Sequence, residues 1–260
     1  MYSGPNLNRK LSTAIIKLRF DKFILGFDLQ KAFLSIALTP IDQSKLLFLW
    51  YRNVLKGNFS VTAYKCLRLP FGLRCSPALL MLGLHKILLE DAKCDESELK
   101  HLKQLIYDLL YRDNGCITSN NKGELEIFYL SLNNIFSPYK FALQQFFTNE
   151  AQLQSKIGEG TEISSSNEVK LLGLKYDRIK DTLSTADLHL SKNANTKRLI
   201  LSTIATNFDL FQFAGAIINR AGMFIHKLQC SKSLSWDDRI SPELQKNGST
   251  FLTRSIIQKV

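Results

Sequence analysis

Short apolar runs separated by turn residues dominate the first half of the chain. Runs of this length, rich in β-branched and aromatic residues, predict strands and short elements. The sequence Lys56-Gly57-Asn58 lies between two of these runs and supplies the turn of a β-hairpin. The elements predicted in this way are 22–28, 33–38, 46–51, 59–67, 105–111, 116–119 and 140–147.

A helical pattern begins at Ser76-Pro77, because serine can cap a helix and proline suits its first turn. The dense Leu, Met and Ile content of residues 78–90 predicts a helix that is buried on most sides. Apolar residues of 125–135 recur at helical spacing and predict an amphipathic helix that ends at Ser137-Pro138. Further helices are predicted over 95–105, 197–207 and 210–228.

The order of these elements favours an α+β fold, with an antiparallel sheet backed by helices and a helical C-terminal part. Residues 170–176 and 181–188 form one more predicted hairpin before the helical part begins. We therefore predict two domains, 1–190 and 191–260, with the boundary near residues 189–195.

The chain has 260 residues and a formal net charge of +11 at pH 7. Lysine and arginine gain affinity for phosphates by releasing condensed counterions, so this charge favours a polyanionic partner. Nucleic acid is the first candidate, and an acidic protein or a membrane surface is the second. The basic residues are spread along the chain, so many of them are equally explained as solvating residues.

The cysteines and histidines lack the spacing of a zinc site or a disulfide framework. No Cys-x-x-Cys pair is present, and we expect reduced thiols in a reducing compartment. The N-terminus has no basic stretch followed by an apolar region, and no apolar run approaches the roughly 18 residues that span a bilayer. We therefore expect neither secretion nor membrane insertion.

Two aspartates, Asp28 and Asp113, each follow a predicted strand. Although they are far apart in sequence, adjacent antiparallel strands would bring both to one edge of a sheet. Paired carboxylates that hold two Mg²⁺ ions about 3.5–4 Å apart are what phosphodiester synthesis by the two-metal route requires. Taken alone, each aspartate is more simply a turn or capping residue.

Other acidic residues compete for the same role. Asp108 also follows an apolar stretch, but on a strand it would face away from Asp113, because an odd number of positions separates them. We therefore choose Asp113. The adjacent Asp237 and Asp238 would point apart on an extended segment and are more simply helix caps.

Three ordered segments resemble the A, B and C motifs of reverse transcriptases. They are Asp28-Leu29-Gln30-Lys31-Ala32-Phe33, Leu69-Pro70-Phe71-Gly72-Leu73-Arg74-Cys75-Ser76-Pro77 and Tyr111-Arg112-Asp113-Asn114. The wider sequence resembles the Pao/BEL group of LTR retrotransposons over nearly the whole chain. The further segments that carry this resemblance are 4–8, 47–50, 171–176, 197–209 and 234–238.

This resemblance implies a polymerase palm with residual fingers in 1–190 and a helical thumb or connection in 191–260. It implies that Asp28 and Asp113 bind the catalytic Mg²⁺ ions, with Mn²⁺ as an alternative and the Leu29 carbonyl as a further ligand. Asn114 stands where the motif usually carries a second catalytic aspartate. Because an amide brings no negative charge to a hard cation, we expect weakened or absent activity.

The same resemblance implies contacts with the substrate. Phe33 would stand against the sugar C2′ position and exclude a 2′ hydroxyl, with an ordinary core phenylalanine as the alternative. Phe71 and Gly72 would lie beside the nascent base pair and the template, or else form an ordinary turn. Tyr111 would pack near the primer terminus, and residues 171–175 would hold the primer strand.

The leading hypothesis is a partial RNA-directed DNA polymerase that extends a primer with dNTPs on an RNA or DNA template. The chain begins just before motif A, so we expect most of the fingers, and the basic residues that hold the triphosphate, to be missing. The alternative is a non-catalytic, nucleic-acid-binding remnant, and a plain scaffold ranks last. In an intact element the partners would be the protease, ribonuclease H and integrase parts, in a cytoplasmic particle or the nucleus.

Overall fold

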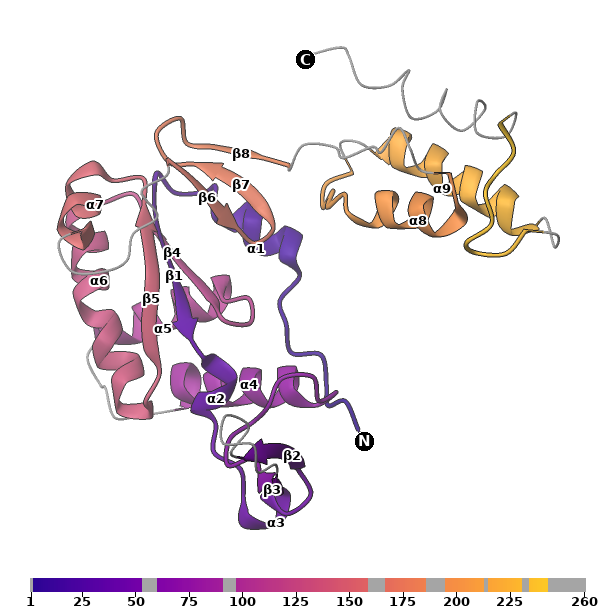
Figure 1. Ribbon diagram of the computed structural model, residues 1–260. Helices are drawn as coiled ribbons and strands as arrows, with labels where there is room; N and C mark the ends of the chain where they lie inside the picture. Colours follow the sequence, from indigo (N-terminus) through magenta and orange to yellow (C-terminus); the bar gives the residue numbers. More distant parts are fainter. Residues whose placement is uncertain are drawn as a thin grey trace. The chain divides into compact units, whose positions relative to one another are not determined.

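The computed structural model describes residues 2–52, 60–90, 97–158, 167–185, 195–212, 215–230 and 234–242. The chain divides into two compact units, 1–167 and 168–260, each of which is described by itself. The expected domain boundary after residue 190 and the predicted turn at 56–58 lie outside the described residues. The α+β class is confirmed, with antiparallel sheets and packed helices (Figure 1).

A three-stranded antiparallel sheet forms the centre of the first unit. Its strands are β1 (Phe23–Gln30), β4 (Asn114–Ser119) and β5 (Ala142–Thr148), in the order β4-β1-β5. β1 pairs with β4 without a break as far as Asp28, which lies opposite Asn114. The pairing of β1 with β5 shifts between Gly26 and Asp28, because β5 carries an extra residue near Gln145, whose φ is 53°.

Alternate residues of β1 point into the hydrophobic core of this unit. Phe27 and Leu29 are buried among helical side chains, and period-two alternation turns Gly26 and Asp28 to the opposite face of the sheet. One of the helices, α6, contacts all three strands and runs beside β5 (Figure 1). The helices that supply most of the core are α4 (Ser76–His85), the π-helical η2 (Lys86–Glu90), α5 (Ser97–Leu109), α6 (Lys122–Phe136) and α7 (Ala151–Gly158).

Two glycines allow aromatic rings to lie across the sheet. Phe147 is opposite Gly26, and Phe27 is opposite Gly115. A Cβ atom on Gly26 would lie 2.1 Å from the Phe147 ring, and one on Gly115 would lie 2.3 Å from the Phe27 ring. The rings occupy the space that side chains would need, so these pairs fix the register of β1 against both neighbours.

The predicted hairpin over 46–51 and 59–67 is confirmed as β2 and β3. On its surface, Phe48, Trp50 and Tyr64 line a pocket of about 370 Å³. The side-chain oxygen of Thr39 accepts a hydrogen bond from the N–H of Asp42 at 3.3 Å and caps the short helix that leads into the hairpin. The elements around the hairpin are α1 (Leu11–Lys17), α2 (Ala32–Ser35), α3 (Pro40–Gln43), β2 (Leu47–Arg52) and β3 (Ser60–Lys65).

The strand predicted over 105–111 is wrong, because α5 continues to Leu109. Leu102 and Ile106 are buried one helical turn apart, and the helix packs against β4 and the neighbouring helices. A short apolar run has the same pattern in a buried helix and in a buried strand, which is why the sequence was misread here. The return strand 116–119 and the strand 140–147 are confirmed as β4 and β5, with shifted ends.

The start of α4 differs from the prediction. Ser76 does not cap the helix: it is the first helical residue, and its Oγ donates to the carbonyl of Pro70 at 2.7 Å. Leu79 and Leu82 are exposed, so α4 is less buried than predicted. The helix predicted over 125–135 is confirmed as α6, which is followed by the 3₁₀ turn η3 (Ser137–Tyr139).

A buried glutamate fixes the end of β5 to the next helix, α7 (Ala151–Gly158). Glu150 accepts hydrogen bonds from the backbone N–H of Leu153 and from Lys122 Nζ, each at 2.7 Å. Burial by itself would raise the pKa of Glu150, but these hydrogen bonds and the charge of Lys122 outweigh it and lower the pKa. The ionised side chain therefore ties α6 to the start of α7.

Within its described residues, the second unit contains a three-stranded meander and a pair of helices. Leu172 and Gly173 have φ values of 51° and 91° and form a two-residue turn, so the predicted strand 170–176 is two strands. The helices predicted over 197–207 and 210–228 are confirmed. The elements are β6 (Glu168–Leu171), β7 (Leu174–Asp177), β8 (Thr182–Ser184), α8 (Lys197–Ala205) and α9 (Gly215–Cys230).

Apolar residues of α8 and α9 form a small core with Ile240, which follows both helices in sequence. Thr196 caps α8 by accepting a hydrogen bond from the N–H of Leu199 at 3.2 Å. Among the helices that the structure describes, none has the length and apolar content needed to cross a membrane.

Replacing Gly115 with alanine is expected to destabilise the first unit, because the new Cβ would force the Phe27 ring or β4 to move. We expect the free energy of unfolding, measured by urea denaturation, to fall by about 1–3 kcal/mol. Gly83→Ala is the matched control, because its Cβ would lie 3.6 Å from Ile36, an ordinary contact, inside a helix that favours alanine. Unchanged stability of the Gly115→Ala chain would contradict this packing.

Candidate active site

Asp28 lies near the end of β1, on the face of the strand opposite Phe27 and Leu29, where burial decreases from Gly26 to Gln30. Its neighbours Phe27 and Leu29 are buried on the other face, so the pleat turns the carboxylate away from the core. Residues directly opposite Asp28 share its face of the sheet, and these are Asn114 on β4 and Gln144 on β5. Three polar side chains from three strands are therefore aligned in one row across the sheet.

Asp113 lies in a two-residue turn between α5 and β4. Tyr111 and Asn114 exchange backbone hydrogen bonds of 2.9 and 3.1 Å across this turn, and Arg112 has a φ of 59°. The carbonyl of Asp113 accepts a hydrogen bond from the N–H of Leu29 at 2.8 Å. This bond attaches the turn to β1 next to Asp28, so the predicted convergence of the two aspartates on one edge of the sheet is observed.

The two carboxylates interact electrostatically, and amide groups compensate part of the cost. Burial raises the pKa of Asp28, a hydrogen bond from Gln144 Nε2 to its Oδ2 at 2.9 Å acts against that rise, and the charge of Asp113 adds to it. Asn114 Nδ2 donates to Asp113 Oδ1 at 3.1 Å. Each aspartate therefore has one amide partner, and the repulsion between the two carboxylates remains.

Gln144 is a site residue that the sequence analysis missed. It reaches Asp28 because the bulge in β5 changes the register at this point. The sequence feature that could have identified it is the pair Gln144-Gln145 inside a strand otherwise rich in phenylalanine and leucine. Polar residues in the middle of an apolar strand often mark a position that faces a functional group.

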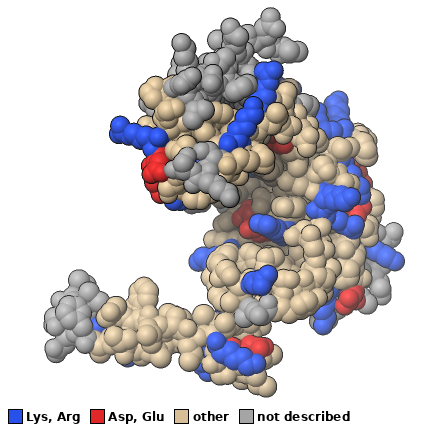
Figure 2. All heavy atoms as spheres, turned by 90° about the vertical axis from the view of Figure 1, so that its right-hand side faces the viewer, with Lys and Arg blue, Asp and Glu red and all other residues tan. Residues whose placement is uncertain are grey.

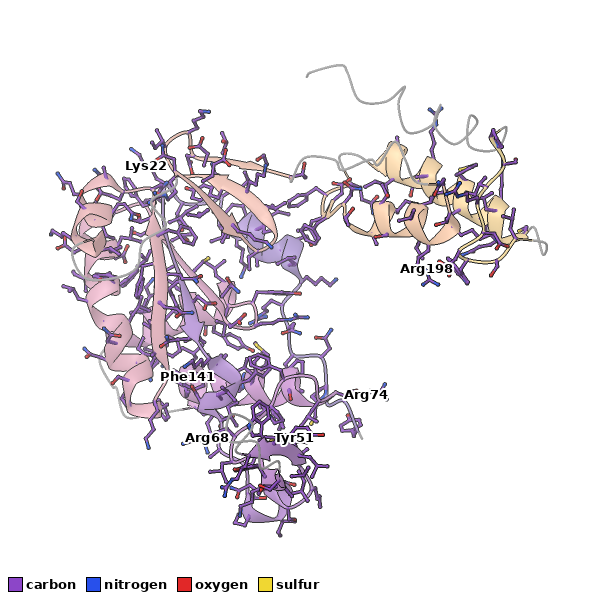
Figure 3. All side chains as sticks on the ribbon, viewed as in Figure 1. Lys22, Tyr51, Arg68, Arg74, Phe141 and Arg198 are labelled. Carbon is purple, nitrogen blue, oxygen red and sulfur yellow. The ribbon has the colours of Figure 1, made fainter. Side chains whose placement is uncertain are left out.

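The loop that carries Phe71 and Gly72 is held beside the helix that follows β1. The N–H of Leu69 donates to the carbonyl of Ile36 at 3.0 Å, and Arg68 forms a β-bridge with Ala37. Arg68 lies where β3 leads back toward α2 (Figure 3). The second sequence motif is thus attached to the end of the first, although the β2–β3 hairpin separates them in sequence.

Phe33 and Phe71 are brought together by this arrangement. Their ring centroids are 4.8 Å apart, with the planes tilted by 57°. Phe33 packs partly against the core, whereas Phe71 is 65% exposed. Gly72 has a φ of 89° and no atom within 4 Å of where a Cβ would lie, so the backbone is open on that side. An exposed aromatic ring beside an accessible backbone is suited to contact with a planar ligand.

Tyr111 and the competing aspartates have structural contacts of their own. Tyr111 is half-buried, and the Arg112 guanidinium lies 5.7 Å from its ring centroid. Asp108 lies on helix α5, so the expectation that it faces away from Asp113 on a strand does not apply. It forms ion pairs with Arg9 at 3.4 Å and with Lys17 at 3.2 Å.

The carboxylates of Asp237 and Asp238 serve the local structure of the second unit through an ion pair and a loop hydrogen bond, and not as the expected helix caps. Asp237 binds the Arg198 guanidinium through both oxygens, at 2.7 and 2.9 Å. Asp238 Oδ2 accepts a hydrogen bond from the N–H of Ser235 at 2.7 Å. Both carboxylates are thus occupied near the start of α8.

The donor set at the candidate site fits a hard divalent cation. Magnesium is typically bound by one or two carboxylates with water and substrate phosphates. The site offers the carboxylates of Asp28 and Asp113, with the amide oxygen of Asn114 as a neutral donor. The described residues contain no group of three or more His, Cys, Asp or Glu side chains placed to hold a metal. Asp28 and Asp113 together supply two carboxylates, fewer than such a group.

The fold is similar to that of solved viral reverse transcriptases. Three structures of foamy viral protease-reverse transcriptase match 95% of this chain at 15% sequence identity: with RNA/DNA hybrid (TM-score 0.55), as a dRH form with ds DNA (0.55) and with dsDNA (0.57). The match covers 29%, 38% and 45% of those chains, so this chain spans less than half of each. At this identity the likeness concerns the fold alone.

A family model gives an independent match in the second unit. The Pao retrotransposon-like RNaseH-like domain matches residues 196–257, which include α8 and α9. The resemblance to the Pao group is supported for this segment, where the sequence analysis expected a thumb or connection. A search of curated proteins gives no match.

Replacing Asp28 with asparagine is expected to stabilise the chain in the absence of divalent metal. Folding raises the pKa of Asp28, so ionisation of this side chain lowers the free energy of unfolding. This loss is absent below the ordinary aspartate pKa of 3.8 and grows as the pH rises through the folded-state pKa. Thermal unfolding midpoints measured in EDTA should therefore be higher for Asp28→Asn at pH 7 and converge with the parent chain in acid.

Asp108→Asn is the matched control for that measurement, because it removes a half-buried aspartate of the same unit. It loses two ion pairs instead of a repulsion, and we expect a decrease of about 0.5–1 kcal/mol in stability at pH 7. If both variants were destabilised alike, the repulsion between Asp28 and Asp113 would not be a significant cost.

Proposed function

We propose that the chain is the palm, with residual fingers, and the helical thumb or connection of a Pao/BEL-type retroelement reverse transcriptase. The observation that carries the proposal is the convergence of Asp28 and Asp113, from β1 and the turn before β4, on one edge of an antiparallel sheet. The reverse-transcriptase fold and the Pao match at 196–257 support the same lineage. The palm would comprise residues 1–190 and the helical part residues 191–260.

In this proposal, Asp28 and Asp113 hold Mg²⁺, or Mn²⁺, with the Leu29 carbonyl as a further ligand. The metal supplies activation of the primer 3′ hydroxyl and charge compensation for the triphosphate. Gln144 orients Asp28 by occupying Oδ2, which leaves Oδ1 for a ligand. The bond between Leu29 and Asp113 keeps both carboxylates at the same level of the sheet.

The aromatic pair would select and seat the nucleotide. Phe33 would stand against the sugar C2′ position and favour deoxynucleotides, since its ring is held in place by the core and by Phe71. Phe71 and Gly72 would lie beside the nascent base pair, where the exposed ring and the open backbone permit close approach. Tyr111 would pack near the primer terminus, and the turn of the β6–β7 hairpin would contact the primer strand.

Asn114 weakens the proposed activity. Its side chain donates to Asp113 and adds no negative charge, so the site attracts a divalent cation less strongly than a site with three carboxylates. We therefore infer an enzyme of reduced activity or none, in which Asp28 and Asp113 remain as the minimal metal-binding pair.

The second candidate is a non-catalytic, nucleic-acid-binding remnant of a retrotransposon polyprotein. Asn114 and the net charge of +11 favour it, because phosphate contacts do not depend on the catalytic metal. Lys and Arg side chains are scattered over the visible surface rather than gathered in one block (Figure 2). The solved relatives hold RNA/DNA hybrid or double-stranded DNA, and a primer-template is the corresponding partner here. In an intact element the remaining polyprotein would be the other partner.

Primer extension on poly(rA)/oligo(dT) with Mg²⁺ or Mn²⁺ tests the first candidate. We expect weak or no extension by the natural chain, a gain of about 10–100-fold in Asn114→Asp as negative charge returns to the metal, and no extension by Asp113→Ala. Robust extension by the natural chain that Asp113→Ala abolishes would contradict the reduced activity but support the site. Extension that survives Asp113→Ala would rule the site out.

Salt titration of binding to a primer-template duplex tests the second candidate. Binding that depends on phosphate contacts should weaken as salt rises, with a slope of log K against log salt steeper than about −2. Asp113→Ala should bind as the parent chain does or more tightly, because it removes a negative charge. A slope near zero would leave the basic side chains without phosphate partners.

A further inference from the structure

The strand β2 is exposed along its whole length, although five of its six residues are apolar or aromatic. Leu49 is 71% exposed, and Leu47, Trp50 and Tyr51 are also exposed over more than half of their surface. Among the strands that the structure describes, β2 pairs with β3 alone, and an isolated hairpin of two strands is marginally stable in water. An apolar surface of this kind indicates a site of association.

The backbone of β2 has one unpaired edge. The N–H of Cys66 donates to the carbonyl of Leu46 at 2.9 Å, which continues the register of the hairpin. Because the N–H and C=O groups of successive residues alternate between the two sides of a strand, those of Leu47, Leu49 and Tyr51 point away from β3. No described strand pairs with them. Exposed edges are commonly protected by lysine, proline or a bulge, and β2 has none of these.

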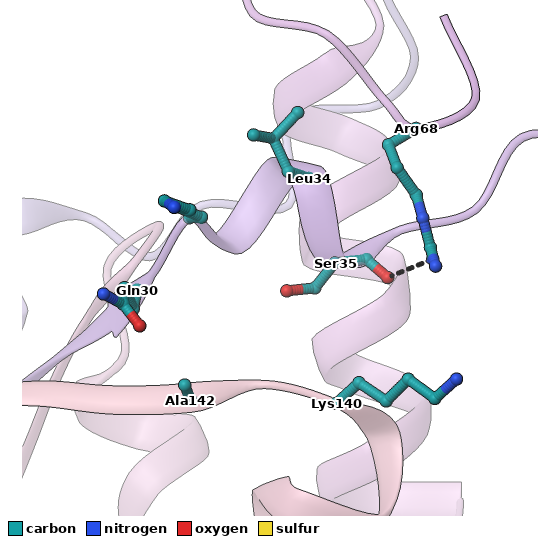
Figure 4. Close-up of a pocket in the computed structure, with 7 residues that line it drawn as sticks. Gln30, Leu34, Ser35, Arg68, Lys140 and Ala142 are labelled. Atoms are coloured by element: carbon teal, nitrogen blue, oxygen red, sulfur yellow. Dashed lines mark hydrogen bonds between the residues drawn. The ribbon is translucent and has the colours of Figure 1, made fainter.

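The other side of the hairpin is bordered by the chain that follows α2. The carbonyl of Leu67 accepts a hydrogen bond from the N–H of Leu38 at 3.2 Å, just beyond the end of β3. Arg68 forms a β-bridge with Ala37, and its guanidinium donates to the carbonyl of Ser35 at 3.3 Å, as the dashed line in Figure 4 marks. Within the described part of the hairpin, the edge of β2 is therefore the open one.

The sequence of β2 is complementary to a second copy of itself in one antiparallel register. When Leu49 lies opposite Leu49 of the second copy, the outward backbone groups of both strands meet and can form a regular ladder. Leu47 then lies opposite Tyr51 of the second copy, and Phe48 lies opposite its Trp50. Every apolar side chain thus meets an apolar side chain on its own face, and such directly opposite pairs stabilise sheets.

The charges and the aromatic side chains agree with this register. The single charged residue of β2 is Arg52, which lies at the end of the strand and donates from Nε to the Tyr64 hydroxyl of its own hairpin at 2.6 Å. Antiparallel pairing would keep the two copies of Arg52 at opposite ends. The rings of Phe48 and Tyr64 are stacked with centroids 5.7 Å apart, and Trp50 of the second copy would extend this row.

We propose that two copies of this chain associate through β2 and form a four-stranded antiparallel sheet around a two-fold axis at Leu49. Both copies use the same edge, so the assembly closes at two chains. A stable interface buries about 800 Å² of each partner, and a pair of six-residue strands, about 20 Å long, covers less than that. We therefore expect a dissociation constant in the micromolar range. This association is independent of the proposed function.

Sedimentation velocity of the full chain from about 1 to 100 μM tests the proposal. We expect the mass to rise from one chain to two as the concentration increases. Leu49→Lys should weaken the association by about tenfold or more, because two lysines would face each other across the axis. Ala63→Lys is the matched control and should associate as the parent chain does. Ala63 is exposed and lies opposite Leu49 on the same face of the hairpin, but it belongs to β3. Thermal unfolding of each variant checks that it folds.

A mixture of Leu49→Lys and Leu49→Glu chains tests the position of the axis. Each variant alone should remain a single chain, and the equimolar mixture should associate, because opposite charges then face each other. The proposal would be overturned by a parent chain that stays single at about 100 μM, by growth beyond two chains, by a mixture that does not associate, or by equal losses in Ala63→Lys and Leu49→Lys. A parent chain that stays single while an oligonucleotide quenches Trp50 fluorescence, in a Trp236→Phe background, would assign the surface to nucleic acid instead.

Discussion

The pairing of β1 with β4, with Asp28 opposite Asn114, is the constraint on which the candidate site depends. A slip of one residue would turn Asp28 into the core and Phe27 out of it, since side chains alternate between the faces. The Phe27 ring over Gly115 and the Phe147 ring over Gly26 oppose such a slip from both sides. Packing in the core thus determines where the carboxylates lie.

The same pairing makes the site energetically costly. Asp28 is partly buried beside a second carboxylate, and its raised pKa records that cost. Gln144 and Asn114 each donate one hydrogen bond to the pair, which reduces the repulsion without removing it. A large apolar core on the other face of the sheet, formed with side chains of the helices that cover it, provides the stability that allows this arrangement to persist.

Sequence patterns predicted most elements, and they failed where the same run of apolar residues is compatible with a buried helix and with a buried strand. The β2–β3 hairpin, α6, α8 and α9 were identified because their spacing or turn residues allow one solution only. The run ending at Leu109 was misread as a strand, yet the turn that follows still brought Asp113 to β1, since a tight turn before β4 suffices. Gln144 was missed because its position depends on a bulge in β5, which its own sequence does not specify.

The amide of Asn114 reduces how strongly the candidate site depends on a bound cation. With aspartate there, three carboxylates would converge and the site would depend on a cation to offset their repulsion. With asparagine, one of those repulsions becomes a hydrogen bond to Asp113, so the folded chain needs the cation less and attracts it less. Under the proposed function, the substitution that reduces catalysis is therefore also one that stabilises the metal-free fold, and a chain that has lost activity can retain its structure.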